Sequence, residues 1–248
     1  MNFRSECRKI KRTGFLPAFI AGGFLAGAVP VLNMLFRSAN YIKPDVNPVE
    51  VLFMANWQTM ALLNILLVLE GACILYHTEY TDNAMQRMRT LPFNESGLFI
   101  NKFLLVLMMC TILVAIEAAA IGFCCEHWFG GTVIHGAAGY MHICIEILES
   151  LGYSLLLVLP AALLSLFIAS ICKNMWVSLG IGVLCIFTAT MLPADNFVLS
   201  LFPFAMPFQI LAGTAPDTVY NFITACIAEI IIILLAEMLF LKARRSFE

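Results

Sequence analysis

Six long apolar segments restrict the fold of this sequence more than any other feature. They run about Phe15–Phe36, Val51–Tyr76, Phe99–Phe123, Ile147–Ile171, Trp176–Pro193 and Thr218–Leu241. About 20 apolar residues in a helix cross the hydrocarbon core of a bilayer, whereas an isolated strand cannot satisfy its backbone hydrogen bonds there. With 61% hydrophobic and 12% charged residues, the chain has more apolar surface than one soluble core can bury. We therefore predict an all-α, polytopic membrane protein with six transmembrane helices in a single domain, residues 1–248.

The positions of lysine and arginine predict how the chain is oriented. If the N-terminus is cytoplasmic, 12 of the 14 basic residues fall on the inner side and only Arg37 and Lys43 on the outer side. Basic residues favour the cytoplasmic side of a membrane, so we expect both termini in the cytoplasm. The basic start and the run Ala26-Gly27-Ala28 are also features of a signal peptide. The 22 residues from Phe15 to Phe36 are long enough to span, and we expect an uncleaved first span.

Two segments outside the spans, one near the N-terminus and one on the outer side, also have a predicted structure. Residues 1–13 place Phe3, Cys7 and Ile10 on one face, which predicts a short amphipathic helix on the inner membrane surface, or otherwise a basic tail that fixes orientation. Residues 194–216 are apolar but contain Pro203 and Pro207. This pattern predicts an outer re-entrant or interfacial segment. Its backbone must be covered by the rest of the protein or must line a cavity.

A second amphipathic helix is expected on the inner side, over residues 77–91. Tyr80, Ala84, Met88 and Leu91 fall on one face, and Pro92 ends the helix. Two interpretations remain open at this point. The helix either bridges the second and third spans, or it is a docking element for a cytoplasmic partner.

Acidic residues within the spans are the candidates for a functional site, because a charge at the centre of a bilayer costs at least about 2.5–3.5 kcal/mol. They are Glu70 in the second span, Glu117 in the third and Glu229 in the sixth. Each either lies on a translocation path or subunit seam, or is a neutral carboxyl hydrogen-bonded within the bundle. Gly23-x-x-x-Gly27 in the first span allows close approach of a neighbouring helix and weakly favours an oligomer interface.

Catalytic and metal-binding patterns are not recognised in the sequence. It has no phosphate-binding loop, zinc-binding H-E-x-x-H or nucleophile elbow, which argues against an enzyme. It also has no basic face of the kind that binds nucleic acid. Cys124 and Cys125 are expected to be exposed, in a solvated outer loop that continues to Trp128. The spacing of His127 and its neighbours matches no familiar metal site, and the oxidation state of the cysteine pair is left open.

Two stretches of the sequence resemble the membrane subunits of ABC-2 type transporters. Locally they are most similar to permeases of lantibiotic (antimicrobial peptide) self-protection and of bacitracin-type export. The first stretch contains Glu6, Lys9, Lys11, Arg12 and Thr13. The second contains Tyr76-His77-Thr78-Glu79-Tyr80, then Met88, Arg89, Leu91, Pro92, Lys102 and Phe103.

The resemblance implies a permease of the bacterial plasma membrane that exports an antimicrobial peptide or a drug-like compound across the lipid bilayer. Two alternatives stay open: a non-transporting membrane scaffold or sensor partner, and an intramembrane enzyme. A separate cytoplasmic ABC ATPase would bind ATP and Mg²⁺, so this chain would need no cofactor of its own. A second permease, identical or related, would complete the transporter. Residues 77–91 would then be the coupling helix that contacts the ATPase, with Asp82, Met85, Arg87, Met88 and Arg89 as the contact residues.

Overall fold

All regular structure that the computed structural model describes is helical. The described residues are 14–42, 46–81, 95–130, 136–172, 174–193, 196–211 and 213–247. The long helices are α2 (Phe15–Tyr41), α3 (Pro48–Thr81), α5 (Glu95–Cys124), α6 (Gly136–Ile171), α7 (Met175–Met191) and α9 (Pro216–Phe247). The short elements are the π-helical turn η1 (Cys125–Phe129), α8 (Phe197–Ser200) and the 3-10 turn η2 (Met206–Phe208).

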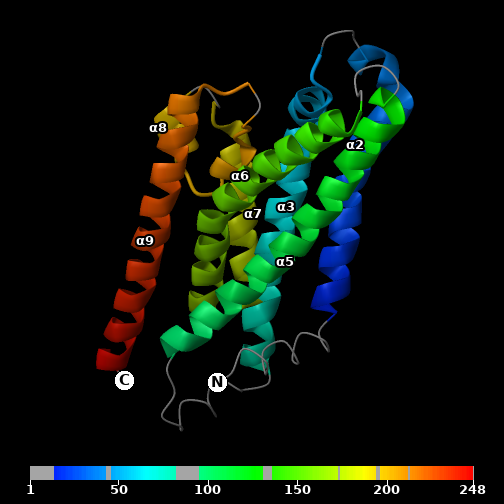
Figure 1. Cartoon of the computed structure of the whole chain (residues 1–248). Coiled ribbons are helices and arrows are strands. Elements are labelled where there is room, and N and C mark those ends of the chain that lie inside the picture. Colours follow the sequence, from blue (N-terminus) through cyan, green and yellow to red (C-terminus); the bar gives the residue numbers. More distant parts are fainter. Residues whose placement is uncertain are drawn as a thin grey trace.

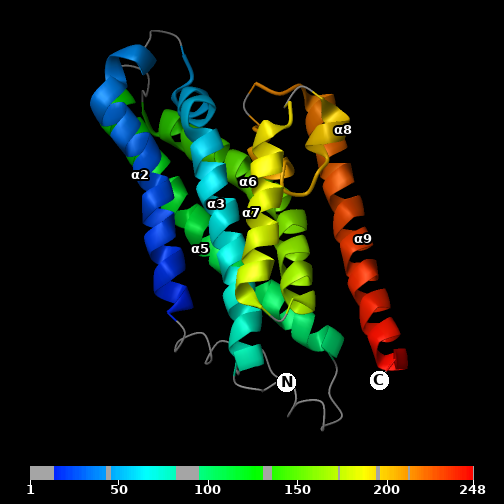
Figure 2. The ribbon, with the colours of Figure 1, turned by 180° about the vertical axis from the view of Figure 1, so that it is seen from behind.

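The long helices run alternately between the two ends of one bundle (Figures 1 and 2). Five of them, α2, α3, α5 with η1, α6 and α9, are long and apolar enough to cross a membrane. Helix α7 has 17 residues, or about 26 Å at 1.5 Å per residue, and lies at the lower limit for a span. The predicted all-α, multi-pass membrane architecture is therefore confirmed. A sixth crossing and the cytoplasmic location of the termini stay predictions.

Several helices extend well beyond the apolar segments that predicted them. Helix α6 begins at Gly136 rather than near Ile147, and α3 continues to Thr81. Residues 77–81 therefore prolong α3 and do not begin a separate helix. Hydropathy marks only the part of a helix that lies in hydrocarbon, whereas polar side chains can continue the helix outside it. In the part of α6 that precedes Ile147, for example, Asn47 Nδ2 donates to both carboxylate oxygens of Glu146, at 2.9 and 3.0 Å.

The predicted outer loop at Cys124–Trp128 is wrong in two respects. Residues 125–129 form η1, which continues α5, and both Cys124 and Cys125 are buried rather than exposed. The physical reason is packing, because this turn joins an apolar cluster with the first turns of α3, including Phe53. Within the described ranges, no three His, Cys, Asp or Glu side chains are close enough to hold a metal ion.

The segment between α7 and α9 turns back into the end of the bundle. Phe204, Ala205 and Met206 are buried there, between residues of α3, α6, α7 and α9. The Trp57 indole of α3 donates to the backbone oxygen of Pro207 at 3.0 Å, and only 2% of Trp57 is exposed. This hydrogen bond attaches the irregular segment between α7 and α9 to the long helix α3.

The two glycines of the first span are used within the chain. A Cβ atom on Gly23 would lie 3.0 Å from Ile116, and one on Gly27 would lie 3.1 Å from the Cβ of Ala120, both on α5. The close neighbour expected from the Gly-x-x-x-Gly pattern is therefore α5 of the same molecule. This pattern gives no support to an oligomer interface.

Substituting Gly27 with valine should force α2 and α5 apart. Overpacking of this kind typically costs about 1–3 kcal/mol, which we expect as a lower unfolding temperature in detergent. Gly122→Val is the matched control, because a Cβ atom at Gly122 meets nothing within 4 Å. Equal effects of the two substitutions would contradict the close packing of α2 on α5.

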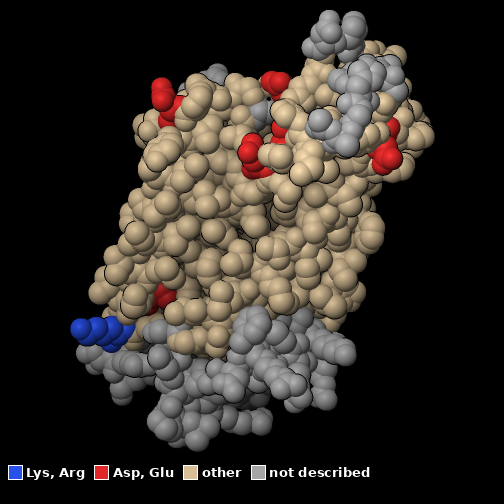
Figure 3. Space-filling view, in the orientation of Figure 1, with Lys and Arg blue, Asp and Glu red and all other residues tan. Residues whose placement is uncertain are grey.

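The visible sides of the bundle carry few charges (Figure 3). Acidic side chains gather at the upper end in this view, where α3 and α6 begin and α8 lies. The uncharged side surface includes many large exposed apolar side chains, among them Phe24, Leu184, Ile232 and Leu239. Such a surface is compatible with lipid and costly in water.

Candidate functional site

A buried ion pair joins the end of α3 to the start of α5. The Lys102 ammonium of α5 lies 3.1 Å from a carboxylate oxygen of Glu79 in α3, and their side chains are 1% and 4% exposed. Because α3 and α5 are consecutive and antiparallel, the last turns of one lie beside the first turns of the other. This juxtaposition brings two residues together that are separated in the sequence by residues 80–101.

Lys102 makes two further interactions with α3. Its ammonium donates a hydrogen bond to the backbone oxygen of Leu75, and it lies 4.5 Å from the centre of the Tyr76 ring. A carboxylate, a carbonyl and an aromatic face therefore surround the buried cation. A buried charge needs such compensation, because the loss of its hydration is otherwise unfavourable.

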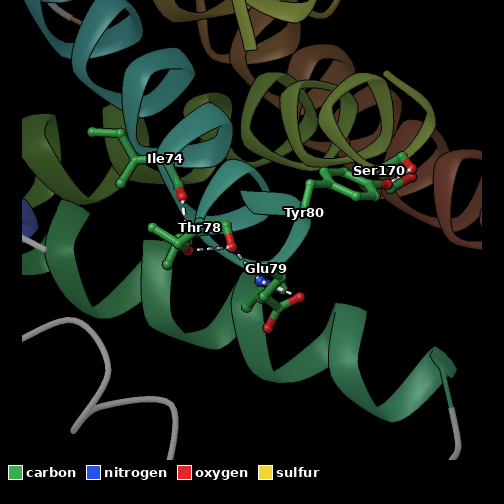
Figure 4. A network of polar contacts seen from close by, with 7 residues as sticks. Ile74, Thr78, Glu79, Tyr80 and Ser170 are labelled. Carbon is green, nitrogen blue, oxygen red and sulfur yellow. Dashed lines mark hydrogen bonds and ion pairs between the residues drawn. The ribbon is translucent and has the colours of Figure 1, made fainter. Parts of the chain in front are cut away.

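Neighbouring contacts extend this site to a third helix (Figure 4). The Tyr80 hydroxyl of α3 donates to the backbone oxygen of Ser170, in the last turn of α6, at 2.6 Å. The Thr78 hydroxyl lies within hydrogen-bond distance of the backbone oxygens of Ile74 and Leu75, at 3.1 and 3.3 Å. Polar contacts thus tie α3, α5 and α6 together at one end of the bundle. We call Glu79, Tyr80, Lys102 and Ser170 the three-helix joint.

The joint lies next to the segment that was predicted to contact an ATPase. Glu79 is two residues before Thr81, the end of α3, and Lys102 is seven residues after Glu95, the start of α5. The predicted contact residues Asp82, Met85, Arg87, Met88 and Arg89 lie outside the described residues, as does the amphipathic helix expected over residues 1–13. The chain on both sides of residues 82–94 is consequently held by one buried ion pair.

The three acidic residues predicted within the spans lie in three different surroundings. Glu70 is exposed on α3, whereas Glu117 of α5 is fully buried and interacts with Asn64 of α3. Glu229 of α9 is half-buried, and one of its carboxyl oxygens is enclosed without a hydrogen bond. The structure therefore does not assemble these three residues into one site.

The pairing of Glu79 with Lys102 was not predicted, although both residues belong to the motif that carried the family resemblance. Asn64 was not among the predicted site residues. A polar amide in the middle of an otherwise apolar run is the signal that could have identified Asn64.

Comparison with known families adds to this geometry. Residues 2–189, more than half of the chain, match the family described as ABC-2 family transporter protein. The chain belongs to this ABC-2 family. No curated protein and no solved structure matches it.

The family match covers α2 to α7 and both sides of the three-helix joint. ABC-2 permeases are membrane components of transporters and generally work with a cytoplasmic ABC ATPase. Together with the helical membrane architecture, this makes the chain a transporter permease subunit.

Proposed function

We propose that this ABC-2 permease expels an antimicrobial peptide from the bacterial plasma membrane, driven by ATP hydrolysis in a separate ABC ATPase. A second permease, identical or related, forms the other half of the pathway. ATP and Mg²⁺ bind to the ATPase, and this chain holds no cofactor. The observation that carries the coupling part of the proposal is the buried Glu79–Lys102 ion pair on either side of residues 82–94.

The three-helix joint is rigid enough to transmit a movement from the cytoplasmic partner to the spans. A force applied to residues 82–94 reaches Thr81 and Glu95, the adjoining ends of α3 and α5. Because Lys102 is held by Glu79 and Leu75, these two helices move together. The hydrogen bond from Tyr80 to Ser170 passes the same displacement to the end of α6. Closure of the ATPase would therefore tilt three long helices as one body and change the exposure of a cavity between the two permeases.

The proposed cargo is supported by the resemblance to lantibiotic self-protection permeases and by the side surface of the bundle. An open groove of about 640 Å³ lies between α2 and α5, and its lining is mostly apolar and includes Phe24, Ala28, Ile112 and Ala119. An amphipathic peptide that has entered the membrane presents apolar side chains at the same depth. Such a peptide would be taken from the membrane and released outside.

The ATPase proposal is tested by purifying the tagged full chain from its native membrane in a mild detergent. We expect an ATPase with a phosphate-binding loop to copurify, together with a permease. The double substitution Arg87→Ala/Arg89→Ala should reduce the recovered ATPase at least several-fold. Lys242→Ala is the matched control, because it removes an exposed positive charge near the end of α9, at the same end of the bundle.

Two results would contradict this part of the proposal. One is recovery of the chain alone under conditions that keep other membrane complexes intact. The other is an unchanged amount of ATPase with the Arg87/Arg89 variant. The cargo is tested separately, by deleting the permease and measuring peptide in the membrane and in the medium. We expect the peptide to accumulate in the membrane after deletion, and an unchanged distribution would exclude it as cargo.

A further inference from the structure

A second polar site lies in the middle of the bundle, away from the three-helix joint. Glu117 of α5 has an exposure of 0%, and neither of its carboxyl oxygens makes a hydrogen bond of ordinary geometry. The side chain that interacts with it is Asn64 of α3, which is 5% exposed. The Asn64 Oδ1 atom is also enclosed without a hydrogen bond. Two oxygens of Glu117 and one of Asn64 are therefore enclosed without a hydrogen bond of ordinary geometry, and the donor beside them is the side-chain amide nitrogen of Asn64.

A small cavity adjoins this pair. Its lining includes Asn64, Ser154 of α6, and Leu113 and Val114 of α5, which are one turn before Glu117. Its volume of about 10 Å³ has room for at most one water molecule. Asn64 and Ser154 contribute oxygen atoms to its lining, and Ser154 already donates to the backbone oxygen of Ser150 at 2.8 Å.

The charges of the described residues leave Glu117 without a basic neighbour. Lys102 is held by Glu79, while Arg37 and Lys242 lie near the ends of α2 and α9. The group that interacts with Glu117 is Asn64 on α3, while Ser154 of α6 lines the cavity beside Asn64 and α2 presents Gly23 and Gly27 to α5. The titratable group nearby on α5 itself is the thiol of Cys110. A bare carboxylate is strongly disfavoured in such a place.

We propose that Glu117 is a proton-binding site, in which the protonated carboxyl donates its hydrogen bond to Oδ1 of Asn64. One proton then satisfies an enclosed carboxyl oxygen and the amide oxygen together. A metal cation would also bring positive charge, but hard cations require about six oxygen ligands. The side-chain oxygens here come from Glu117 and, in the adjoining cavity, from Asn64 and Ser154, which are too few for such a cation. The arrangement therefore fits a proton better than a cation.

This inference goes beyond the proposed transport function, because it makes the permease itself take up and release a proton. When tilting of the bundle opens the small cavity beside Asn64 to water, the O–H bond of Glu117 breaks and the proton passes to water, leaving a hydrated carboxylate. When the cavity closes again, water returns the proton and leaves the site. The proton is therefore bound in the closed conformation and released in the hydrated one.

Infrared spectroscopy of the full chain in lipid bilayers at neutral pH tests the proposal. A protonated carboxyl has a carbonyl band that is separate from the carboxylate bands. We expect this band in the wild-type protein, its loss in Glu117→Gln, and a shift in Asn64→Leu, where the acceptor is missing. Glu149→Gln is the matched control, because Glu149 is exposed on α6 and its removal should leave the band unchanged.

Glutamine has the shape and neutrality of a protonated glutamate, so Glu117→Gln should fold with an unchanged unfolding temperature. The proposal is overturned if neither Glu117→Gln nor Asn64→Leu alters the carbonyl band. It is also overturned if NaCl, compared with choline chloride, stabilises the wild-type protein but not Glu117→Gln, because that result identifies a cation site. The band belongs to the permease alone, so failure to recover an ATPase leaves this test unaffected.

Discussion

Replacing Lys102 with methionine is expected to destabilise the protein by about 3–5 kcal/mol, because it leaves the buried Glu79 carboxylate without its cation. Methionine preserves most of the length and apolar surface of the lysine side chain, so the effect reports the charge and its hydrogen bonds. Unfolding in mixed detergent micelles measures the change. Lys242→Met, at an exposed position, is the matched control and should alter stability by no more than about 0.5 kcal/mol.

A double-mutant cycle separates the ion pair from general effects on packing. Glu79→Gln combined with Lys102→Met removes both charges, and the loss should be smaller than the sum of the two single losses. Residues in direct contact commonly show interaction energies of about 0.5–3 kcal/mol. Additive losses would show that Glu79 and Lys102 do not interact. In that case, the ion pair would not make α3 and α5 move together.

Replacing Trp57 with alanine is expected to cost about 3–5 kcal/mol, because a large, nearly fully buried side chain is removed. The same change removes the hydrogen bond to Pro207, so residues 201–211 should become more accessible to proteases added at that end of the bundle. Thermal unfolding and limited proteolysis measure these two effects. A variant with normal stability and unchanged proteolysis would contradict the role of Trp57 as an anchor.

Two further tryptophan substitutions show which interaction matters. Trp57→Phe retains most of the apolar contact but leaves the Pro207 oxygen without its donor, for which we expect a loss of about 1–3 kcal/mol. Trp176→Ala removes a tryptophan that is 77% exposed on α7 and should change stability by about 0.5 kcal/mol or less. An equal effect of Trp57→Ala and Trp176→Ala would show that burial at Trp57 contributes little.

The candidate sites were only partly predictable from the sequence. Glu79 and Lys102 were both recognised in the family motif, but their pairing depends on how α3 and α5 lie against each other. Glu117 was identified because it is a carboxyl in an apolar segment. Its interaction with Asn64 was not predicted, since the two residues belong to different helices. Depth along a helix follows from residue number, whereas the direction of a side chain around the helix follows from packing.

The length and hydropathy of each segment by themselves determined that this protein is helical and lies in a membrane. Hydrocarbon offers no hydrogen bonds to the backbone, so each long apolar segment has one favourable conformation. The ends of the helices were less determined, as α6 shows by beginning at Gly136, because polar contacts such as Asn47–Glu146 prolong them. Only the tertiary structure decided which faces meet. In helices that are apolar on all sides, hydropathy does not mark the buried face, and close packing selects it, as at Gly27 against Ala120.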